Sequence, residues 1–203
     1  MLRLAVLVSG SGTNLQAILD GCRDGQIPAQ VVVVISDRTR ALALERARQA
    51  GVSAVVVRRR DHADQQGFDQ ALSKACAAAG VDLVVYAGFM RVVGSHFLEH
   101  WQGRCINVHP SLLPAFPGLD APAQALAYGV RITGCTVHFM DAGVDTGPII
   151  LQEAVPVEAD DTPERLHERI QHAEWRILPE AIRLFAAGRL RLEGRRVQIA
   201  NEG

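Results

Sequence analysis

Strand-like and helix-like patterns alternate through the first half of the chain. Four short runs are hydrophobic at nearly every position, as parallel strands covered on both faces are. They span 2–8, 30–35, 53–57 and 81–87. Apolar residues recur at helical spacing in the segments between them, 14–23, 40–50 and 65–79. This alternation predicts right-handed strand–helix–strand units and a doubly wound sheet.

The second half is less regular, although its pattern still predicts elements. Strand-like segments span 104–109, 133–140 and 149–157, and a short helix spans 123–128. The strict alternation over 133–140 is typical of a strand with one exposed face. A long amphipathic helix begins at Asp161-Thr162-Pro163 and should bend at Pro179. A hairpin over 189–199 follows, so we expect one α/β domain over 1–203 with a mostly parallel, Rossmann-like sheet.

Composition narrows the class of protein. Of the 203 residues, 48% are hydrophobic and 21% charged, which excludes intrinsic disorder. The formal net charge of −1 argues against nucleic-acid and membrane-surface binding, because both need a basic field. No segment has the pattern of a targeting leader or a membrane span, so we expect a cytoplasmic protein. Its four cysteines form no C-x-x-C pair and should be reduced and mostly buried.

A glycine-rich turn follows the first predicted strand. Residues 9–14 read Ser-Gly-Ser-Gly-Thr-Asn and lead directly into a helix. Such a turn presents backbone N–H groups to an anion at a helix start. Leu15 replaces the third glycine of the dinucleotide fingerprint, and Asp37 could mimic the ribose-binding acid, although its spacing from Gly10 is long for that role. The turn therefore favours a phosphate monoester, with a purely structural tight turn as the alternative.

Polar residues at the end of the fifth predicted strand are candidates for catalysis. Asn107 and His109 share one face of that strand, at the carboxyl end where α/β folds keep their sites. An amide donor beside an imidazole suits acyl transfer, because one group can stabilise an oxyanion and the other can relay a proton. Asp145 lies in a glycine-rich loop before another strand. It could orient and charge His109, or it could only shape its own turn.

Two other clusters resemble sites less convincingly. His96, Glu99 and His100 match an H-x-x-E-H zinc pattern, but no third ligand is obvious. We therefore expect a surface helix there and no metal. The run Arg58-Arg59-Arg60 suits a solvated loop, with contact to an acidic substrate tail as the alternative.

Taken together, these segments resemble the phosphoribosylglycinamide formyltransferases of purine biosynthesis. The resemblance covers nearly the whole chain, from Leu4 to about Leu192. It is carried by Ser9-Gly10-Ser11-Gly12-Thr13-Asn14-Leu15-Gln16, Ala87-Gly88-Phe89-Met90-Arg91, Asn107-Val108-His109-Pro110-Ser111-Leu112-Leu113-Pro114, Phe116-Pro117-Gly118 and Asp145-Thr146-Gly147-Pro148-Ile149.

The resemblance also implies binding roles and a cis Leu113–Pro114 bond. Residues 1–100 would form a phosphoribosyl-binding half, and 101–203 a catalytic and folate-binding half. The phosphate and the rest of glycinamide ribonucleotide would contact Gly12, Thr13, Asn14, Gln171 and Glu174. The folate would contact Met90, Arg91, Val92, Val93 and Asn107.

The implied reaction is direct transfer of a formyl group from the co-substrate 10-formyltetrahydrofolate to the amine of the ribonucleotide. Asn107 and protonated His109 would stabilise the oxyanion. Asp145 would keep His109 protonated and help move a proton to N10 of the folate, without a metal. The implied partners are these small molecules alone, and the protein would be a monomer or a homodimer.

Three positions depart from the family pattern. Gln65 stands where an arginine often contacts the folate tail, and Asp120 and Pro122 stand where histidines can follow the Pro-Gly segment. The alternatives are another folate-dependent formyltransferase, a formyltetrahydrofolate hydrolase, or a non-catalytic folate- or nucleotide-binding module. The first two would bring a further domain that this sequence lacks. Simple binding would not need Asn107, His109 and Asp145 together.

Overall fold

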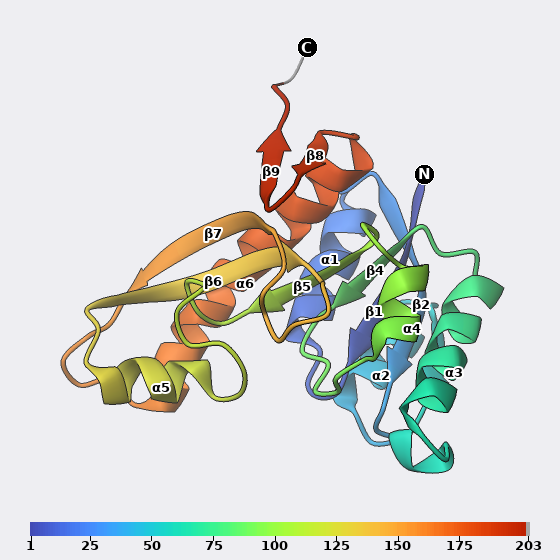
Figure 1. Ribbon diagram of the computed structural model, residues 1–203, viewed down its shortest axis with the longest axis horizontal. Coiled ribbons are helices and arrows are strands. Elements are labelled where there is room, and N and C mark those ends of the chain that lie inside the picture. Colours follow the sequence, from blue (N-terminus) through green and yellow to red (C-terminus); the bar gives the residue numbers. More distant parts are fainter. Residues whose placement is uncertain (202–203) are drawn as a thin grey trace. The chain divides into compact units, whose positions relative to one another are not determined.

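The structure is a computed structural model that describes residues 1–201 (Figure 1). Seven strands form one mostly parallel sheet in the order β3-β2-β1-β4-β5-β6-β7, which confirms the expected α/β, Rossmann-like class. The strands are β1 Leu2–Val8, β2 Ala29–Ser36, β3 Ser53–Val56, β4 Leu83–Tyr86, β5 Cys105–His109, β6 Ile132–Phe139 and β7 Ile149–Pro156. The predicted hairpin is also confirmed: β8 Leu190–Glu193 pairs with β9 Arg196–Ile199.

Helices occupy the segments that the apolar spacing predicts. Their boundaries differ from the expected ones by one or two residues, as helix ends usually do. They are α1 Thr13–Arg23, α2 Leu42–Gln49, α3 Gln65–Ala78, α4 Ser95–His100, α5 Ala121–Tyr128 and α6 Pro163–Ala186, with a single 3₁₀ turn at Arg59–Asp61. No helix within residues 1–201 combines the length and hydropathy needed to cross a bilayer.

The chain forms two compact units, which divide between Ile106 and Asn107. This division falls inside β5. The functional halves expected from the sequence, 1–100 and 101–203, therefore have a slightly different boundary, and their assignment stays a prediction.

In the first unit, β1 is the central strand. It pairs in parallel with β2 on one side and with β4 on the other, and residues 4–8 are completely buried. This burial explains why the strand is hydrophobic at successive positions. Because the strands are parallel, their carboxyl ends meet at one edge. Ser9, Asp37 and the segment 88–91 follow these ends and are therefore brought to the same edge.

In the second unit, α6 packs against the antiparallel pair of β6 and β7, and also contacts α5 (Figure 1). The buried side of α6 carries the apolar residues that the sequence pattern indicated: Leu166, Ile170, Ala173, Ile177, Ala181 and Leu184. The helix continues through Pro179, and the expected bend there stays a prediction. Burial of this long face is what holds the helix to the sheet.

The expectation that β6 has one exposed face is wrong. Residues 133–139 are buried on both faces. Helix α6 contacts the strand, and the loop after β5 bonds to it as well. The hydroxyl of Thr136 donates to the carbonyl of Ser111 at 2.7 Å and accepts from the backbone N–H of Leu113 at 3.0 Å. The polar positions in the alternation therefore bond to a loop instead of facing water.

The cysteines are thiols in the structure. Cys76, Cys105 and Cys135 are buried, as expected, and Cys22 is partly buried. Burial raises the pKa of Cys22 to about 11 and the pKa of Cys76 and Cys135 to about 12. These thiols therefore stay protonated at neutral pH and are poor nucleophiles.

We expect the start of α6 to contribute measurably to stability. The side chain of Thr162 accepts a hydrogen bond from the backbone N–H of Arg165 at 3.3 Å. Thr162→Ala removes this cap and should lower the free energy of unfolding by about 1 kcal/mol in urea denaturation. Thr162→Ser keeps the hydroxyl and is the matched control. Equal stability of the alanine and serine variants would contradict the capping role.

Candidate functional site

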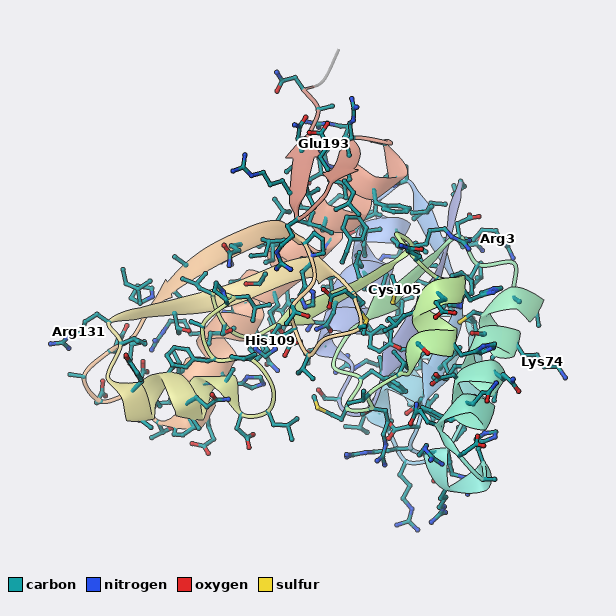
Figure 2. The ribbon with its side chains drawn as sticks, in the orientation of Figure 1. Arg3, Lys74, Cys105, His109, Arg131 and Glu193 are labelled. Atoms are coloured by element: carbon teal, nitrogen blue, oxygen red, sulfur yellow. The ribbon has the colours of Figure 1, made fainter. Side chains whose placement is uncertain are left out.

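The candidate catalytic residues come together in the second unit. Strand alternation places Asn107 and His109 on the same face of β5, and His138 comes from β6. Asp145 lies in the loop between β6 and β7, where its left-handed backbone (φ 54°) also shapes a turn. His109 is labelled in Figure 2. It is buried, whereas Asn107 and Asp145 are partly buried.

The carboxylate of Asp145 is the common partner in this cluster. Its Oδ2 atom lies 3.3 Å from Nδ1 of His109 and accepts the backbone N–H of Gly118 at 2.8 Å. Its Oδ1 atom accepts from Nδ2 of Asn107 at 3.4 Å and lies 3.7 Å from Nε2 of His138. The pairing of Asp145 with His109 is therefore present in the geometry. Its role in a reaction stays a prediction.

Hydrogen bonding and burial act in opposite directions on His109. Nε2 lies 2.8 Å from the carbonyl of Phe116, which only accepts, and Nδ1 faces the carboxylate of Asp145. Both partners favour the imidazolium. Burial is nevertheless the largest effect and lowers the pKa of His109 below its usual value, although Phe116 and Asp145 raise it. The expectation that Asp145 keeps His109 protonated does not describe the free protein, because desolvation outweighs the carboxylate.

The pKa of Asp145 is lowered. Its partial burial acts to raise the pKa, but the interaction with His138, the N–H of Gly118 and the charge of His109 together outweigh burial. Asp145 is therefore a stable carboxylate at neutral pH.

His138 also belongs to the cluster and was not among the residues predicted from the sequence. Its Nδ1 atom lies 2.8 Å from the carbonyl of Phe139, so Nδ1 carries the proton. In the neutral ring Nε2 then accepts, and it lies 3.3 Å from Nδ2 of Asn107. The amide nitrogen of Asn107 therefore faces both Asp145 and His138. The only signal in the sequence was a histidine in the alternation of β6, which alone does not predict a site.

The phosphate-binding turn predicted at residues 9–14 lies in the first unit. Gly12, with a left-handed φ of 75°, is the N-cap residue of α1, and no side chain caps the helix. The first backbone N–H groups of a helix have no acceptor inside it, so they suit an anion. Arg46 of α2, which was not predicted from the sequence either, donates to the carbonyl of Ser11 at 2.8 Å. Its guanidinium brings positive charge next to the turn.

The other predicted binding residues lie in two places. In the first unit, Met90 and Val92 are 57% and 75% exposed, and Val93 is buried. In the second unit, Gln171 and Glu174 lie on α6: Nε2 of Gln171 is 3.1 Å from Nε2 of His167, and Glu174 is buried. The binding roles of all five stay predictions, as does that of Arg91.

The histidine-rich segment 96–100 and the arginine run 58–60 both lie at the surface or form local contacts. His96, Glu99 and His100 lie exposed on α4. Within residues 1–201 no three His, Cys, Asp or Glu side chains are placed to hold a metal ion together. In the arginine run, Arg58 pairs with Asp61 at 2.6 Å and Arg59 donates to a backbone carbonyl.

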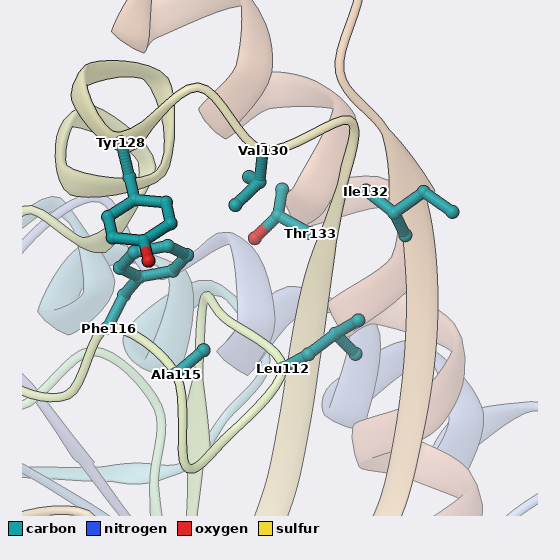
Figure 3. A pocket seen from close by; sticks show the side chains of 7 residues that line it. All are labelled: Leu112, Ala115, Phe116, Tyr128, Val130, Ile132 and Thr133. Atoms are coloured by element: carbon teal, nitrogen blue, oxygen red, sulfur yellow. The ribbon is translucent and has the colours of Figure 1, made fainter.

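An apolar pocket of about 480 Å³ lies beside the loop that contacts His109 (Figure 3). The rings of Phe116 and Tyr128, 5.8 Å apart between centroids, form one wall, and the lining includes Thr133. None of the residues predicted to bind folate or ribonucleotide lines this pocket. The ring of Phe116 lines the pocket, and its backbone carbonyl faces the ring of His109.

We expect the imidazole of His109 to titrate below pH 6.5 in an NMR titration of the free protein, because burial lowers its pKa. Asp145→Asn should move the midpoint lower still, since the carboxylate raises it. Because the folded pKa lies below the unfolded one, the stability that neutral His109 contributes should be lost as pH falls below about 6.5.

The matched control for this titration is Asp141→Asn. Asp141 lies in the same loop, and its carboxylate bonds to Thr146 and to the backbone N–H of Gly143. This variant should leave the midpoint of His109 unchanged. A midpoint that rises or stays constant in Asp145→Asn would contradict the pairing.

Comparisons with known proteins identify relatives over almost the whole chain. The formyl transferase family model matches residues 2–182. The chain is 48% identical to the phosphoribosylglycinamide formyltransferase of Mycobacterium tuberculosis, over 97% of this chain and 94% of the relative. It is also 48% identical to a trifunctional purine biosynthetic protein of Drosophila melanogaster, over 92% of this chain. It spans only 14% of that longer protein.

Solved structures agree with these sequence matches. The glycinamide ribonucleotide transformylase 1 of Symbiobacterium toebii is 60% identical with a TM-score of 0.98, over 99% of this chain and 95% of that one. A formyltetrahydrofolate deformylase from Burkholderia mallei is 27% identical with a TM-score of 0.88, over 98% of this chain and 70% of that one. On the family match and these identities, the chain belongs to the formyl transferase family.

Proposed function

We propose that this protein transfers the formyl group of 10-formyltetrahydrofolate to the amine of glycinamide ribonucleotide, a step of purine biosynthesis. The observation that carries the proposal is the cluster of Asn107, His109 and Asp145 around one carboxylate. It occurs in a member of the formyl transferase family whose full-length relatives carry the name of this enzyme. Acyl transfer to an amine needs oxyanion stabilisation and a proton path, and the cluster supplies donors for both.

In the proposed reaction the amine attacks the formyl carbon, and the carbonyl electrons move to its oxygen. The amide of Asn107 donates to this oxyanion, and an N–H of His109 donates as well. Collapse of the tetrahedral intermediate breaks the bond to N10 of the folate. The proton that the amine loses must reach N10, so atoms and charge balance without a metal or a covalent enzyme intermediate.

His109 is proposed to carry this proton. In the free protein its lowered pKa keeps the ring mostly neutral at neutral pH, so it can accept a proton from the amine. The negative charge of the oxyanion would then raise the pKa of His109, adding to the effect of Asp145. The proton on Nε2 faces the carbonyl of Phe116, so an oxyanion that uses this donor has to replace that carbonyl.

Separate parts of the chain are proposed to bind the two substrates. The turn around Gly12, Thr13 and Asn14 would hold the phosphate, with Arg46 adding positive charge. Gln171 and Glu174 would contact the rest of the ribonucleotide. The exposed apolar side chains of Met90 and Val92 would contact the pterin ring, together with Arg91, Val93 and Asn107. Exposed apolar side chains are typical of ligand-binding surfaces.

The structural similarity to a deformylase makes hydrolysis the main rival, since water could replace the amine as nucleophile. One assay separates the two activities. Purified protein is mixed with 10-formyltetrahydrofolate, with and without glycinamide ribonucleotide, and formylated ribonucleotide and free formate are both quantified. Transfer predicts formylated ribonucleotide and little formate. Formate release that does not depend on the ribonucleotide would favour hydrolysis, and no product of either kind would favour a binding module.

We expect Asn107→Ala to lower kcat by roughly 10²–10³ in the same assay, because it removes one donor to the oxyanion. The affinity for the ribonucleotide should change little. Gln102→Ala, which removes an exposed carboxamide outside the cluster, is the control and should retain full activity. Near-normal kcat in Asn107→Ala would remove Asn107 from the mechanism.

We expect Gly12→Ala to weaken ribonucleotide binding and to spare folate binding. A Cβ atom at Gly12 would lie 2.6 Å from Cβ of Ala43, and the left-handed φ adds strain. Gly25→Ala is the matched control, because its φ is also left-handed (74°) but its Cβ meets nothing within 4 Å. Calorimetric titration of each variant with each ligand tests the assignment. Equal loss of both ligands in Gly12→Ala would contradict it.

A further inference from the structure

A fully buried carboxylate joins the two predicted binding segments of the first unit. Asp37 follows β2, and its side chain is 0% exposed. Its Oδ1 atom accepts from the hydroxyl of Ser9 at 2.6 Å, and its Oδ2 atom accepts from Nε of Arg91 at 2.7 Å. Ser9 is the first residue of the phosphate-binding turn. Arg91 belongs to residues 90–93, which are predicted to contact the folate and are called the folate segment below. The reaction proposed above does not use Asp37.

The same serine is bonded to the folate segment through its own atoms. Its hydroxyl oxygen accepts the backbone N–H of Met90 at 2.8 Å, and its backbone N–H donates to the carbonyl of Gly88 at 3.0 Å. The hydrogen bonds therefore form a continuous path from Met90 to Ser9, to Asp37 and to Arg91. Because β2, β1 and β4 are parallel neighbours, their carboxyl ends bring these residues together.

The geometry of these hydrogen bonds should be fixed, because a buried carboxylate has lost its water and is stable only when protein donors replace that water. Both oxygens of Asp37 have such donors, and one donor is a guanidinium, which makes the bond charge-assisted. A role for Asp37 in binding a ribose hydroxyl is therefore disfavoured. Both of its oxygens are already engaged inside the protein.

We propose that Asp37 is a positioning residue for both substrate subsites. It orients Ser9 beneath the phosphate turn, and it orients Arg91 and, through Ser9, the backbone of Met90 in the folate segment. It acts through these residues and does not touch substrate. The inference rests on the proposed function for the identity of the two ligands.

A second buried carboxylate provides a comparison within the same unit. Asp69 of α3 accepts from the backbone N–H of Gly94 at 2.9 Å and from Nε2 of Gln65 at 2.7 Å. Nε2 of Gln65 also donates to the carbonyl of Val92 at 3.1 Å. Asp69 therefore holds the far end of the folate segment, and the bonds described for it do not reach Ser9. Its removal should disturb one subsite only.

The experiment measures the affinity of the intact protein for each ligand separately, by calorimetric titration with glycinamide ribonucleotide and with tetrahydrofolate. Asp37→Ala removes the acceptor of Ser9 and Arg91, so both dissociation constants should rise about tenfold or more. Asp69→Ala should raise only the dissociation constant for the folate. Steady-state assays should show the same pattern in KM, with a smaller change in kcat, because the proposed catalytic groups are unaltered.

A conservative variant tests the role of Asp37 in case Asp37→Ala does not fold. In Asp37→Asn the amide oxygen can still accept from Arg91, and the amide nitrogen can donate to the oxygen of Ser9. The side chain keeps its shape and one acceptor, but the charge and the acceptor for the hydroxyl proton of Ser9 are lost. Circular dichroism and thermal melting show whether each variant is folded. Affinities between those of wild type and Asp37→Ala are expected for Asp37→Asn.

The possible outcomes are distinct. The inference is overturned if folded Asp37→Ala keeps wild-type affinity for either ligand. It is also overturned if Asp37→Ala and Asp69→Ala affect the two ligands alike. Should Asp37→Ala fail to fold, wild-type affinities for both ligands in Asp37→Asn would overturn it. Wild-type protein that binds neither ligand would instead contradict the proposed function, and the inference would fall with it.

Discussion

Asp145 holds the candidate catalytic cluster together, since a partly buried carboxylate has to replace lost water with donors. It obtains them from the backbone N–H of Gly118 and from the amide of Asn107, and the rings of His109 and His138 lie beside it. These groups come from the end of β5, the loop after it, β6 and the loop before β7. One anion therefore sets the positions of segments that are distant in the sequence. The same requirement explains why Asn107 presents its amide nitrogen to the cluster.

The first unit uses the same principle with two other carboxylates. Asp37 and Asp69 are both buried and both satisfied by donors, and each is bonded to the segment between β4 and α4. This segment carries exposed apolar side chains, which by themselves would not hold it in place. Buried acidic groups beneath it supply directional bonds that hydrophobic contact lacks. The side chains of Met90 and Val92 are thus exposed while the backbone of the segment stays anchored.

His109 shows how burial and charge compete at such a site. The carboxylate of Asp145 and the carbonyl of Phe116 both favour a protonated ring, but removal from water favours the neutral one and prevails. A negative charge that forms beside the ring raises its pKa, because a nearby opposite charge favours the protonated form. A formyl transfer site needs this property, because an oxyanion is present only during the reaction. The low pKa of the resting state and the expected role of His109 are therefore compatible.

The sequence by itself determined the elements, the class of the sheet and the family. Continuous apolar runs predicted the parallel strands, because strands buried on both faces have no polar side. The strand ending in Asn107 and His109 and the turn at 9–14 indicated candidate sites through local chemistry alone. Local periodicity could predict these features because each depends on residues close together in the chain.

Only the tertiary structure decided which distant groups meet. It placed Asp145 beside His109, added His138 and Arg46, and joined Asp37 to Ser9 and Arg91. It also buried both faces of β6, where the alternation had predicted an exposed one. The pattern of residues within a strand cannot predict that a loop from elsewhere in the chain will pack on that strand. The balance that lowers the pKa of His109 likewise depends on burial, a property of the whole fold and not of the residues around position 109.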